Sequence, residues 1–567
     1  MLKENYNHGL EVFEVLRNMR DTVELTPYNS MVFVYITYEA LDQDIEIPQS
    51  EDNLSSFLEK TIEIESIESV KTFISGLDYT KIDFRIFKDL AAFGKEFLKD
   101  FILEVDLGSY FGRLGGTSTP PSILKYIPYI DNISDKELVA DFFSGFGNSS
   151  SYLMDLGVKQ LESIELISEN VSIQEMKRKV MRVENSYHIV NEDIFDYFKD
   201  NNFEKFEFIF ADMPWGLHLA NIQPEWKSDL IETNIPKTES EWTILSLILS
   251  QLTKEGKALV TVPNRIEFSS IAQEIRKEFI EKGYIEKVIQ LPSNVYSTMG
   301  IPSLLIVLSF NNEHIDFIDA SEMYTKVGRQ NIFTDDDIKK IMSDDFAYHK
   351  VVSLDDVWQN DRLLPSFYTV TEISNYFELS DVATIIRGQN FKKLELDNLI
   401  VNEVTGIELI RTSNLSEFSI ENTQNLTDLP ERYVELLDQD IIITRVGSVK
   451  SISIFEKDND VVSIIDQSLL IIRVDRSKID PYYLLGYFTS DLGKEQLTTA
   501  YSSGSIGQVS IKNLEKVKIP GLNTLEQQKI AERTHENVSK IKRLKFQLSY
   551  SLEELKEQTN QFFEGGF

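Results

Sequence analysis

The sequence contains no cysteine at all, although it is 567 residues long. Disulfide bonds and thiolate metal sites are therefore excluded. The six histidines are scattered without the spacing of a metal site, so we expect no bound metal. No apolar run approaches the roughly 18 residues of a membrane-spanning helix, and the N-terminus does not resemble a signal peptide. We expect a cytoplasmic protein that does not engage a membrane.

Positive charge is scarce, and the sequence lacks the nucleotide-binding motif that a DNA translocase would need. The chain has 57 Lys and Arg against 92 Asp and Glu, a net charge of −35, which repels DNA at long range. Any contact with nucleic acid must therefore come from local basic positions. No Gly-x-x-x-x-Gly-Lys-Ser/Thr motif is present, so cleavage of DNA would need a separate subunit.

The most informative segment joins an apolar strand, expected at 208–211, to Asp212-Met213-Pro214-Trp215. The carboxylate of Asp212 and the backbone carbonyl of Met213 can accept hydrogen bonds from an exocyclic amine. Pro214 shapes the corner, and Trp215 offers a face on which a ring can stack. A flipped-out base needs such a pocket. A plain strand-to-turn junction with Trp215 in the core is the alternative.

An upstream segment also ends a strand in an acid. The expected strand that begins at Leu138 reaches Asp141, which is followed by Gly145, Gly147 and the start of a helix. The glycines let the backbone approach a ligand closely, and Asp141 stands where open α/β sheets bind ligands. A glycine-rich turn without a ligand is the alternative.

Two more strands are expected between these segments. The strand at 161–166 ends near Glu165, about 20 residues past the glycines, where an acid can hold both hydroxyls of a ribose. A third short strand from Tyr187 is followed by Asp193, where the amine of an adenine could be read. Four strand–helix units, each with an acid at the strand end, predict one ligand crevice along the sheet edge.

Residues 105–345 resemble the N6-adenine DNA methyltransferases of type I restriction–modification systems. Segments 288–308 and 317–338 resemble the downstream signature of that family. The resemblance makes Asp212, Met213, Pro214 and Trp215 the catalytic corner. It implies S-adenosyl-L-methionine as the cofactor, bound by Thr119, Asp141, Gly145, Gly147, Glu165 and Asp193.

Three positions depart from the family's pattern. Met213 replaces the first proline of the catalytic tetrapeptide, Phe142 replaces the proline after Asp141, and Ser118 replaces an aromatic residue. Without the fixed φ of proline the catalytic corner is less pre-organised. Two alternatives stay open: a catalytically silent paralogue that serves as a DNA- or partner-binding scaffold, and an enzyme that acts on RNA or a peptide.

Residues 379–522 resemble a target recognition domain of type I specificity subunits, with matching segments at 379–388, 440–447 and 509–514. Specificity subunits carry two such domains, and this chain shows one. The resemblance implies double-stranded DNA as a partner. The alternative for the basic residues of this region is that they are ordinary solvated charges. The residues expected to contact DNA are Arg387, Arg445, Lys450 and Lys512.

The last segment is predicted to be one long helix, 524–563, in which Ile541, Leu548, Leu555 and Phe562 recur every seven residues. This seam predicts either a homodimer or docking of a separate specificity or restriction subunit. A helix packed on its own domain is the alternative.

The predicted fold class is α/β, in five parts. They are a helical N-terminal region (1–104), a Rossmann-like S-adenosylmethionine-dependent methyltransferase domain (105–345), a connector (346–378), an α+β target recognition domain (379–522) and the C-terminal helix (523–567).

Overall fold

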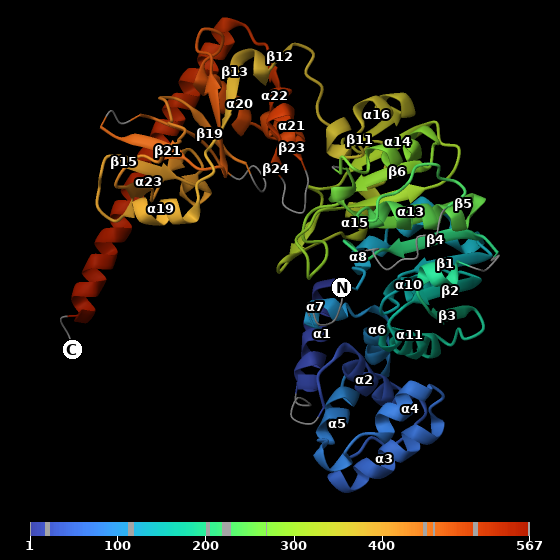
Figure 1. Cartoon of the computed structure of the whole chain (residues 1–567). Coiled ribbons are helices and arrows are strands. Elements are labelled where there is room, and N and C mark those ends of the chain that lie inside the picture. The colour runs from blue at the N-terminus through green and yellow to red at the C-terminus, as the bar shows by residue number, and fades with distance from the viewer. Residues whose placement is uncertain are drawn as a thin grey trace. The chain divides into compact units, whose positions relative to one another are not determined.

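The structure is a computed structural model, and it forms two compact units, Met1–Thr369 and Val370–Phe567 (Figure 1). Among the residues described, no helix is long and apolar enough to cross a bilayer. The described residues are 2–17, 23–111, 118–199, 204–217, 228–267, 269–445, 451–457, 460–502 and 508–564.

The first unit begins with a helical region built around α2 (Pro27–Asp42). Thr26 caps this helix by accepting a hydrogen bond from the backbone N–H of Asn29 at 3.1 Å, and every residue from Ser30 to Ala40 is buried. A helix that is apolar all round must lie inside a bundle. The surrounding helices are α1 (Leu2–Arg17), α3 (Glu51–Ile64), α4 (Glu68–Ser75), α5 (Arg85–Ala91), α6 (Lys95–Glu104) and α7 (Leu107–Phe111).

The centre of the unit is a nine-stranded sheet of order β11-β8-β6-β7-β5-β4-β1-β2-β3. Strands β3, β2, β1, β4 and β5 are parallel, and β7 is antiparallel to both β5 and β6. The strands are β1 (Leu138–Phe142), β2 (Gln160–Glu165), β3 (Tyr187–Asn191), β4 (Phe206–Asp212), β5 (Leu252–Pro263), β6 (Ile285–Gln290), β7 (Ser303–Leu308), β8 (His314–Asp319) and β11 (His349–Ser353).

Strand β4 is central because both of its faces are buried. Phe208 and Phe210 pack into the core on one face of the sheet, whereas Ile209 and Ala211 pack into the core on the other. This alternation follows from the two-residue period of a strand. The order of the strands reverses between β1 and β4, which is where parallel α/β sheets open a ligand crevice at their carboxyl edge.

Helices cover both faces of this sheet, as expected for the α/β class (Figure 1). The helical region shares its core with Phe146 and with Ile173, Met176 and Val180 of α11. The helices of this part are α8 (Pro121–Leu124), α9 (Ile127–Ile130), α10 (Asn148–Asp155), α11 (Ser168–Met181), α12 (Ile194–Tyr197), α13 (Ser240–Gln251), α14 (Gln273–Glu281), α15 (Asp335–Ile341), α16 (Leu354–Asn360) and α17 (Pro365–Tyr368), with a hairpin of β9 (Thr325–Val327) and β10 (Gln330–Ile332).

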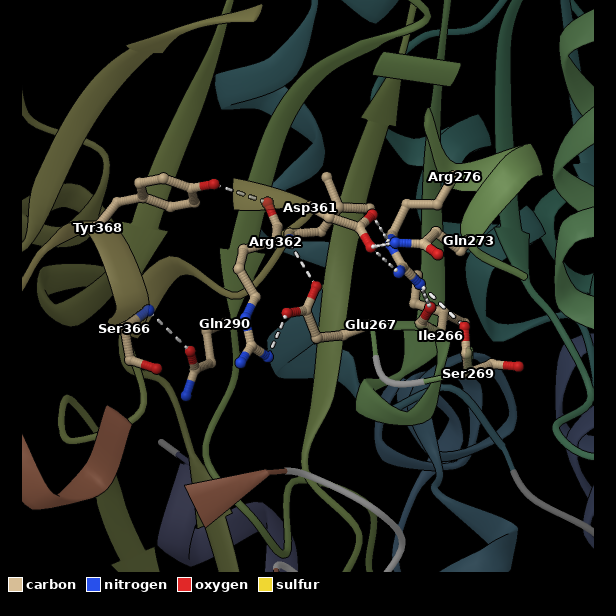
Figure 2. A network of polar contacts seen from close by, with 11 residues as sticks. Ile266, Glu267, Ser269, Gln273, Arg276, Gln290, Asp361, Arg362, Ser366 and Tyr368 are labelled. Carbon is tan, nitrogen blue, oxygen red and sulfur yellow. Dashed lines mark hydrogen bonds and ion pairs between the residues drawn. The ribbon is translucent and has the colours of Figure 1, made fainter. Parts of the chain in front are cut away.

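The expected connector, 346–378, contains β11, which pairs with β8 as the edge strand of the sheet. Figure 2 shows how the residues that follow β11 are fixed. The guanidinium of Arg276 donates two hydrogen bonds to Asp361, at 2.8 and 2.7 Å, and two more to the carbonyls of Ile266 and Ser269. The segment is therefore anchored to helix α14 by a largely buried ion pair.

A second carboxylate completes this network. Glu267 is buried and accepts hydrogen bonds from Arg362, at 3.1 Å, and from the backbone N–H of Leu363 (Figure 2). Burial raises the pKa of Glu267 to about 7, although Arg362 lowers it. The hydroxyl of Tyr368 donates to the carbonyl of Arg362 at 2.9 Å, and the ring of Tyr368 stacks on Phe317 of β8. The sequence offered no signal for these long-range pairs.

The second unit is α+β, as expected. Strands β12 and β25 pair, which joins the start of the domain to its end. One sheet has the order β13-β22-β19-β20 and the other β14-β18-β15-β21. The strands are β12 (Tyr376–Glu378), β13 (Ala383–Arg387), β14 (Ile400–Val401), β15 (Ile407–Ile410), β16 (Leu415–Ser416), β17 (Ser419–Ile420), β18 (Gln424–Leu426), β19 (Ile441–Thr444), β20 (Ile452–Ile454), β21 (Val462–Ile465), β22 (Leu469–Val474), β23 (Tyr501–Ser502), β24 (Gln508–Val509) and β25 (Lys518–Pro520).

The predicted long C-terminal helix is present as α23 (Thr524–Glu564). Ala531 and Val538 lie in the core of the second unit, and α23 packs along α20. Gly486 of α20 faces Thr534 so closely that a Cβ at this position would collide with the Thr534 hydroxyl. The other helices are α18 (Leu379–Val382), α19 (Lys393–Leu399), α20 (Pro481–Thr489), α21 (Asp491–Ala500) and α22 (Ile511–Glu515).

We predict that Arg276→Met destabilises the first unit by about 3 kcal/mol, because Asp361 keeps a buried charge without its partner. The side chains of the pair are only 4% and 17% exposed. All four tryptophans, Trp215, Trp226, Trp242 and Trp358, belong to the first unit, so their fluorescence during urea unfolding reports on this unit alone. The exposed Arg85→Ala should leave the curve unchanged, and an equally small effect of Arg276→Met would contradict the prediction.

Candidate active site

The carboxyl ends of four neighbouring strands bring the predicted acids to one edge of the sheet. In the order β4-β1-β2-β3, these strands carry Asp212, Asp141 and Glu165, and β3 leads to Asp193. The register pairs Asp141 with Ser163 of β2 and with Phe210 of β4.

Asp141 is fully buried beneath the start of α10. One carboxylate oxygen accepts hydrogen bonds from the hydroxyls of Ser149, at 2.6 Å, and Ser150, at 2.5 Å. The other oxygen is buried, and no described residue donates a hydrogen bond to it. The pKa of Asp141 is raised to about 7, chiefly by burial and also by the charges of Asp212 and Glu165, against the opposing hydrogen bonds of Ser149 and Ser150. A cation at this edge would relieve that repulsion.

Glu165 binds the glycine-rich loop that follows β1. Its Oε2 accepts a hydrogen bond from the backbone N–H of Gly145 at 2.8 Å, and its Oε1 accepts one from Ile167 at 2.8 Å. Gly147 has a φ of +77°, and a Cβ there would lie 2.7 Å from the side chain of Gln174. This conformation and this crowding require glycine. The loop and the ribose-binding acid of the prediction are thus in direct contact.

The two remaining cofactor candidates differ in their surroundings. Asp193 is half-buried and caps α12, because its carboxylate accepts a hydrogen bond from the backbone N–H of Phe195 at 2.9 Å. Thr119 is buried and lies at the predicted catalytic corner, where its hydroxyl donates to Oδ2 of Asp212 at 2.7 Å.

Asp212 is surrounded by hydroxyl donors from three distant parts of the chain. Besides Thr119, the hydroxyl of Tyr296 donates to Oδ1 at 2.7 Å, and the hydroxyl of Thr261 donates to the same oxygen. Burial raises the pKa of Asp212, and the three hydroxyls oppose that shift. A carboxylate offers about four lone-pair sites, so three donors leave one site for a further N–H.

The residues after Asp212 form a packed corner. Met213 is 2% exposed and its side chain lies in the core, so packing holds the position where the family has proline. Pro214 is half-buried. Trp215 meets the ring of Tyr296 edge to face, with the centroids 5.1 Å apart and an interplanar angle of 77°. The indole N–H of Trp215 is buried and has no hydrogen-bond partner among the described residues.

Three residues at this corner were missed as site residues in the sequence. Thr261 lies directly beside Asp212 in the register of β4 and β5, and Tyr296 follows β6. Glu241, 1% exposed at the start of α13, accepts hydrogen bonds from the backbone N–H of Gly216 at 3.1 Å and from Arg265 at 2.8 Å. Tyr296 stood in the downstream segment of the resemblance, but no pattern gave it a partner.

The predicted DNA-binding residues are placed unevenly. Arg387 at the end of β13 and Arg445 just after β19 both donate to Gln467. Lys512 is exposed on α22. Lys450 lies outside the described residues.

Comparison with known proteins gives two family matches, which share one short overlap. Residues 115–375 match the N-6 DNA Methylase family. Residues 372–554 match the type I restriction modification DNA specificity domain. The chain joins an N-6 DNA methylase to a type I specificity domain. The expected methyltransferase with a recognition domain and the expected cofactor, S-adenosyl-L-methionine, are thereby confirmed, and these comparisons give no support to the silent scaffold.

Individual relatives belong to type I systems. The methylase subunit of the type I restriction enzyme MpnII from Mycoplasma pneumoniae is 24% identical over 65% of this chain and 71% of its own length. The MjaVII methylase subunit of Methanocaldococcus jannaschii is 26% identical over 30% of this chain and 32% of its own length. Among solved structures, a type I methyltransferase subunit from Streptococcus thermophilus shares the fold, with 18% identity, a TM-score of 0.50, and coverage of 64% of this chain and 99% of that one.

We predict that Tyr296→Phe moves the acid limb of the pH profile of kcat/KM for methyl transfer to higher pH by about one unit. The Tyr296 hydroxyl stabilises the carboxylate form of Asp212, so its loss raises the pKa of Asp212, at roughly 1.4 kcal/mol per unit. The phenylalanine ring keeps the contact with Trp215. Tyr284→Phe, which removes a hydroxyl remote from Asp212, is the control, and identical profiles for both variants would contradict the prediction.

Proposed function

We propose that this protein transfers the methyl group of S-adenosylmethionine to N6 of adenine in DNA. The observation that carries the proposal is the carboxylate of Asp212, which is held by three hydroxyls and keeps one lone-pair site for an amine. Trp215 stands next to it as a stacking surface. Asp141 lies on β1, next to β4, and Glu165 lies on the following strand, β2. The cofactor binds at this edge of the sheet in this fold.

Each residue has a stated task in this proposal. Asp212 and the backbone carbonyl of Met213 accept the two hydrogens of the adenine amine, which aims the nitrogen lone pair at the methyl group. Pro214 fixes the corner and Trp215 stacks on the base. Glu241 stabilises the corner, because its carboxylate accepts a hydrogen bond from the backbone N–H of Gly216.

The residues at the sheet edge fit S-adenosylmethionine. Bound there, the cofactor supplies a methyl group on a positively charged sulfur. Asp141 and Glu165 offer the negative charge that such a cation needs, and Glu165 lies where the ribose hydroxyls can be held. Gly145, Gly147, Thr119 and Asp193 complete the proposed binding site. Methyl transfer then depends mainly on proximity and orientation, which is what this site supplies.

We predict that Asp212→Ala lowers the rate of methyl transfer by at least about 100-fold. The adenine amine then loses a hydrogen-bond acceptor, and its lone pair is no longer oriented toward the methyl group. DNA binding should stay nearly unchanged, since the recognition unit is separate. Transfer of tritiated methyl groups from S-adenosylmethionine to genomic DNA measures the first effect, and a filter-binding assay measures the second. Asp196→Ala, at an exposed position of α12, is the control.

Met213→Pro restores the pattern of the family at the corner and should hold or raise the rate. Full activity of Asp212→Ala would show that the site is elsewhere. An inactive native chain that Met213→Pro makes active would show that the protein is a degenerate enzyme.

We also propose that two copies pair through the distal part of α23. Lys545 joins α23 to its own domain: its ammonium donates to the carbonyl of Glu417 at 2.7 Å and to Ser416 at 2.9 Å. This contact explains why a lysine interrupts the apolar seam. Beyond it, Leu548 and Leu555 are each 60% exposed. Phe562, the last member of the predicted seam, lies outside the described side chains.

A second copy is the partner that suits this surface. The chain carries one recognition domain, so a two-fold pair would read two half-sites on one duplex. The exposed residues Leu544, Leu548, Leu552 and Leu555 recur at spacings of three and four, which is the pattern of a helix that pairs with another helix.

We predict that Leu548→Asp with Leu555→Asp halves the mass measured by light scattering, because charges in the seam disfavour pairing. Phe546→Asp with Tyr550→Asp is the matched control: these residues are equally exposed but lie on the opposite face of α23, at 3.6 residues per turn. The methylated site should be a split palindrome. A native chain that is monomeric with and without DNA, and that methylates an unsplit asymmetric site, would contradict the dimer.

A further inference from the structure

Two loops carry hydroxyls that hold Asp212, and each of these loops has a serine next to its donor. Thr119, just before α8, donates to Oδ2 of Asp212 at 2.7 Å, and Tyr296, after β6, donates to Oδ1 at 2.7 Å. Ser118 directly precedes the threonine, and Ser297 directly follows the tyrosine. A contact made by either serine therefore also affects the position of the neighbouring donor.

Both serines donate to one further carboxylate, that of Asp106. The hydroxyl of Ser118 donates to Oδ1, and the hydroxyl of Ser297 donates to Oδ2 at 3.2 Å. Asp106 and Asp212 thus each cross-link the same two loops, through adjacent residues. Ser118 is buried whereas Ser297 is exposed, so the bond from Ser118 is better shielded from competing water. This bond gives a role to a serine that departs from the family's aromatic residue.

The backbone of Asp106 is fixed between α6 and α7. On one side, the carbonyl of Val105 accepts a hydrogen bond at 3.1 Å from the side-chain amide of Asn148, the first residue of α10. On the other side, Leu107 is 1% exposed and belongs to the core of the helical region. The position of the Asp106 carboxylate is therefore set by the helical region and by the helix that follows the glycine-rich loop.

The two loops need such a support, because neither donor lies on a strand or a helix. Thr119 belongs to an irregular segment before α8, and Tyr296 lies among the turns between β6 and β7. Their hydroxyls stabilise the charged form of Asp212 only when distance and alignment are both favourable. A second cross-link reduces the number of conformations that the two loops can adopt.

We propose that Asp106 is a positioning residue for methyl transfer. Through the two serines it holds the hydroxyls of Thr119 and Tyr296 in line with Asp212. This inference rests on the proposed function, and it assigns to Asp106 an action through its neighbours. Without the cross-link the two hydroxyls align less well, so the charged form of Asp212 is less stabilised and the adenine amine is held less firmly.

The test compares Asp106→Ala with the native chain in steady-state methyl transfer over a range of pH. The variant should lower kcat by about tenfold, because a small misplacement of the acceptor is costly, and should leave the KM for S-adenosylmethionine within about twofold. The acid limb of the pH profile of kcat/KM should move to higher pH by about half a unit, since the pKa of Asp212 rises. Asp100→Ala, which removes an exposed carboxylate of α6, is the control of equal charge.

Two further variants separate positioning from folding. Asp106→Asn keeps both hydrogen bonds, because its amide oxygen accepts from Ser118 and its amide NH2 donates to the hydroxyl oxygen of Ser297. This variant should keep kcat and the acid limb near their native values. Ser118→Ala combined with Ser297→Ala should reproduce Asp106→Ala, and adding Asp106→Ala to that pair should change neither quantity further. If Asp106→Ala does not fold, the serine pair carries the same prediction.

A purely structural role predicts a lower melting temperature for Asp106→Ala with an unchanged kcat and an unchanged acid limb, and that result would overturn the proposal. Additive effects of Asp106→Ala and the two serine changes would also overturn it, because Asp106 would then not act through the serines. A native chain that transfers no methyl group to DNA would instead remove the proposed function, and with it this role of Asp106.

Discussion

The burial of one carboxylate, that of Asp212, is the constraint on which the catalytic unit depends. An isolated buried charge is costly, and the pKa of Asp212 rises for that reason. Its stabilisation requires hydroxyls from Thr119, Thr261 and Tyr296, which are far apart in the chain. The nine-stranded sheet brings them together, because β5 runs beside β4 and β6 delivers the loop that carries Tyr296. The site around Asp212 therefore forms only when the whole sheet has formed.

Local sequence patterns predicted the strands and the loop of the site. They could not predict contacts between residues that are far apart in the sequence. An apolar run that ends in an acid marked the strands that carry Asp141 and Asp212, since a buried parallel strand is apolar until it reaches the sheet edge. The loop after the first of these strands was recognised from Gly145 and Gly147, because glycines let the backbone approach a ligand closely. Thr261 could not be recognised, because its role arises only from the register of β4 and β5.

The same limit applies outside the site. Residues 346–378 were expected to connect the two domains, and nothing in the sequence indicated that Asp361 would form an ion pair of 2.7 Å with Arg276 of α14. Lys545 lies in the helix that carries the predicted seam, and its hydrogen bonds to Ser416 and Glu417 of its own unit had no signal in the sequence. In the recognition unit, Gln467 carried no motif, and its meeting with two arginines is a property of the folded turn.

The most direct test of the central claim is the identity of the methylated product. Unmethylated DNA would be incubated with the purified chain and S-adenosylmethionine that carries a deuterated methyl group, then digested to nucleosides and analysed by mass spectrometry. The account predicts N6-methyldeoxyadenosine as the labelled nucleoside, because we propose that Asp212 and the Met213 carbonyl accept hydrogen bonds from an exocyclic amine beside Trp215. A label found only in a cytosine derivative, or in protein or RNA added to the same reaction, would contradict it.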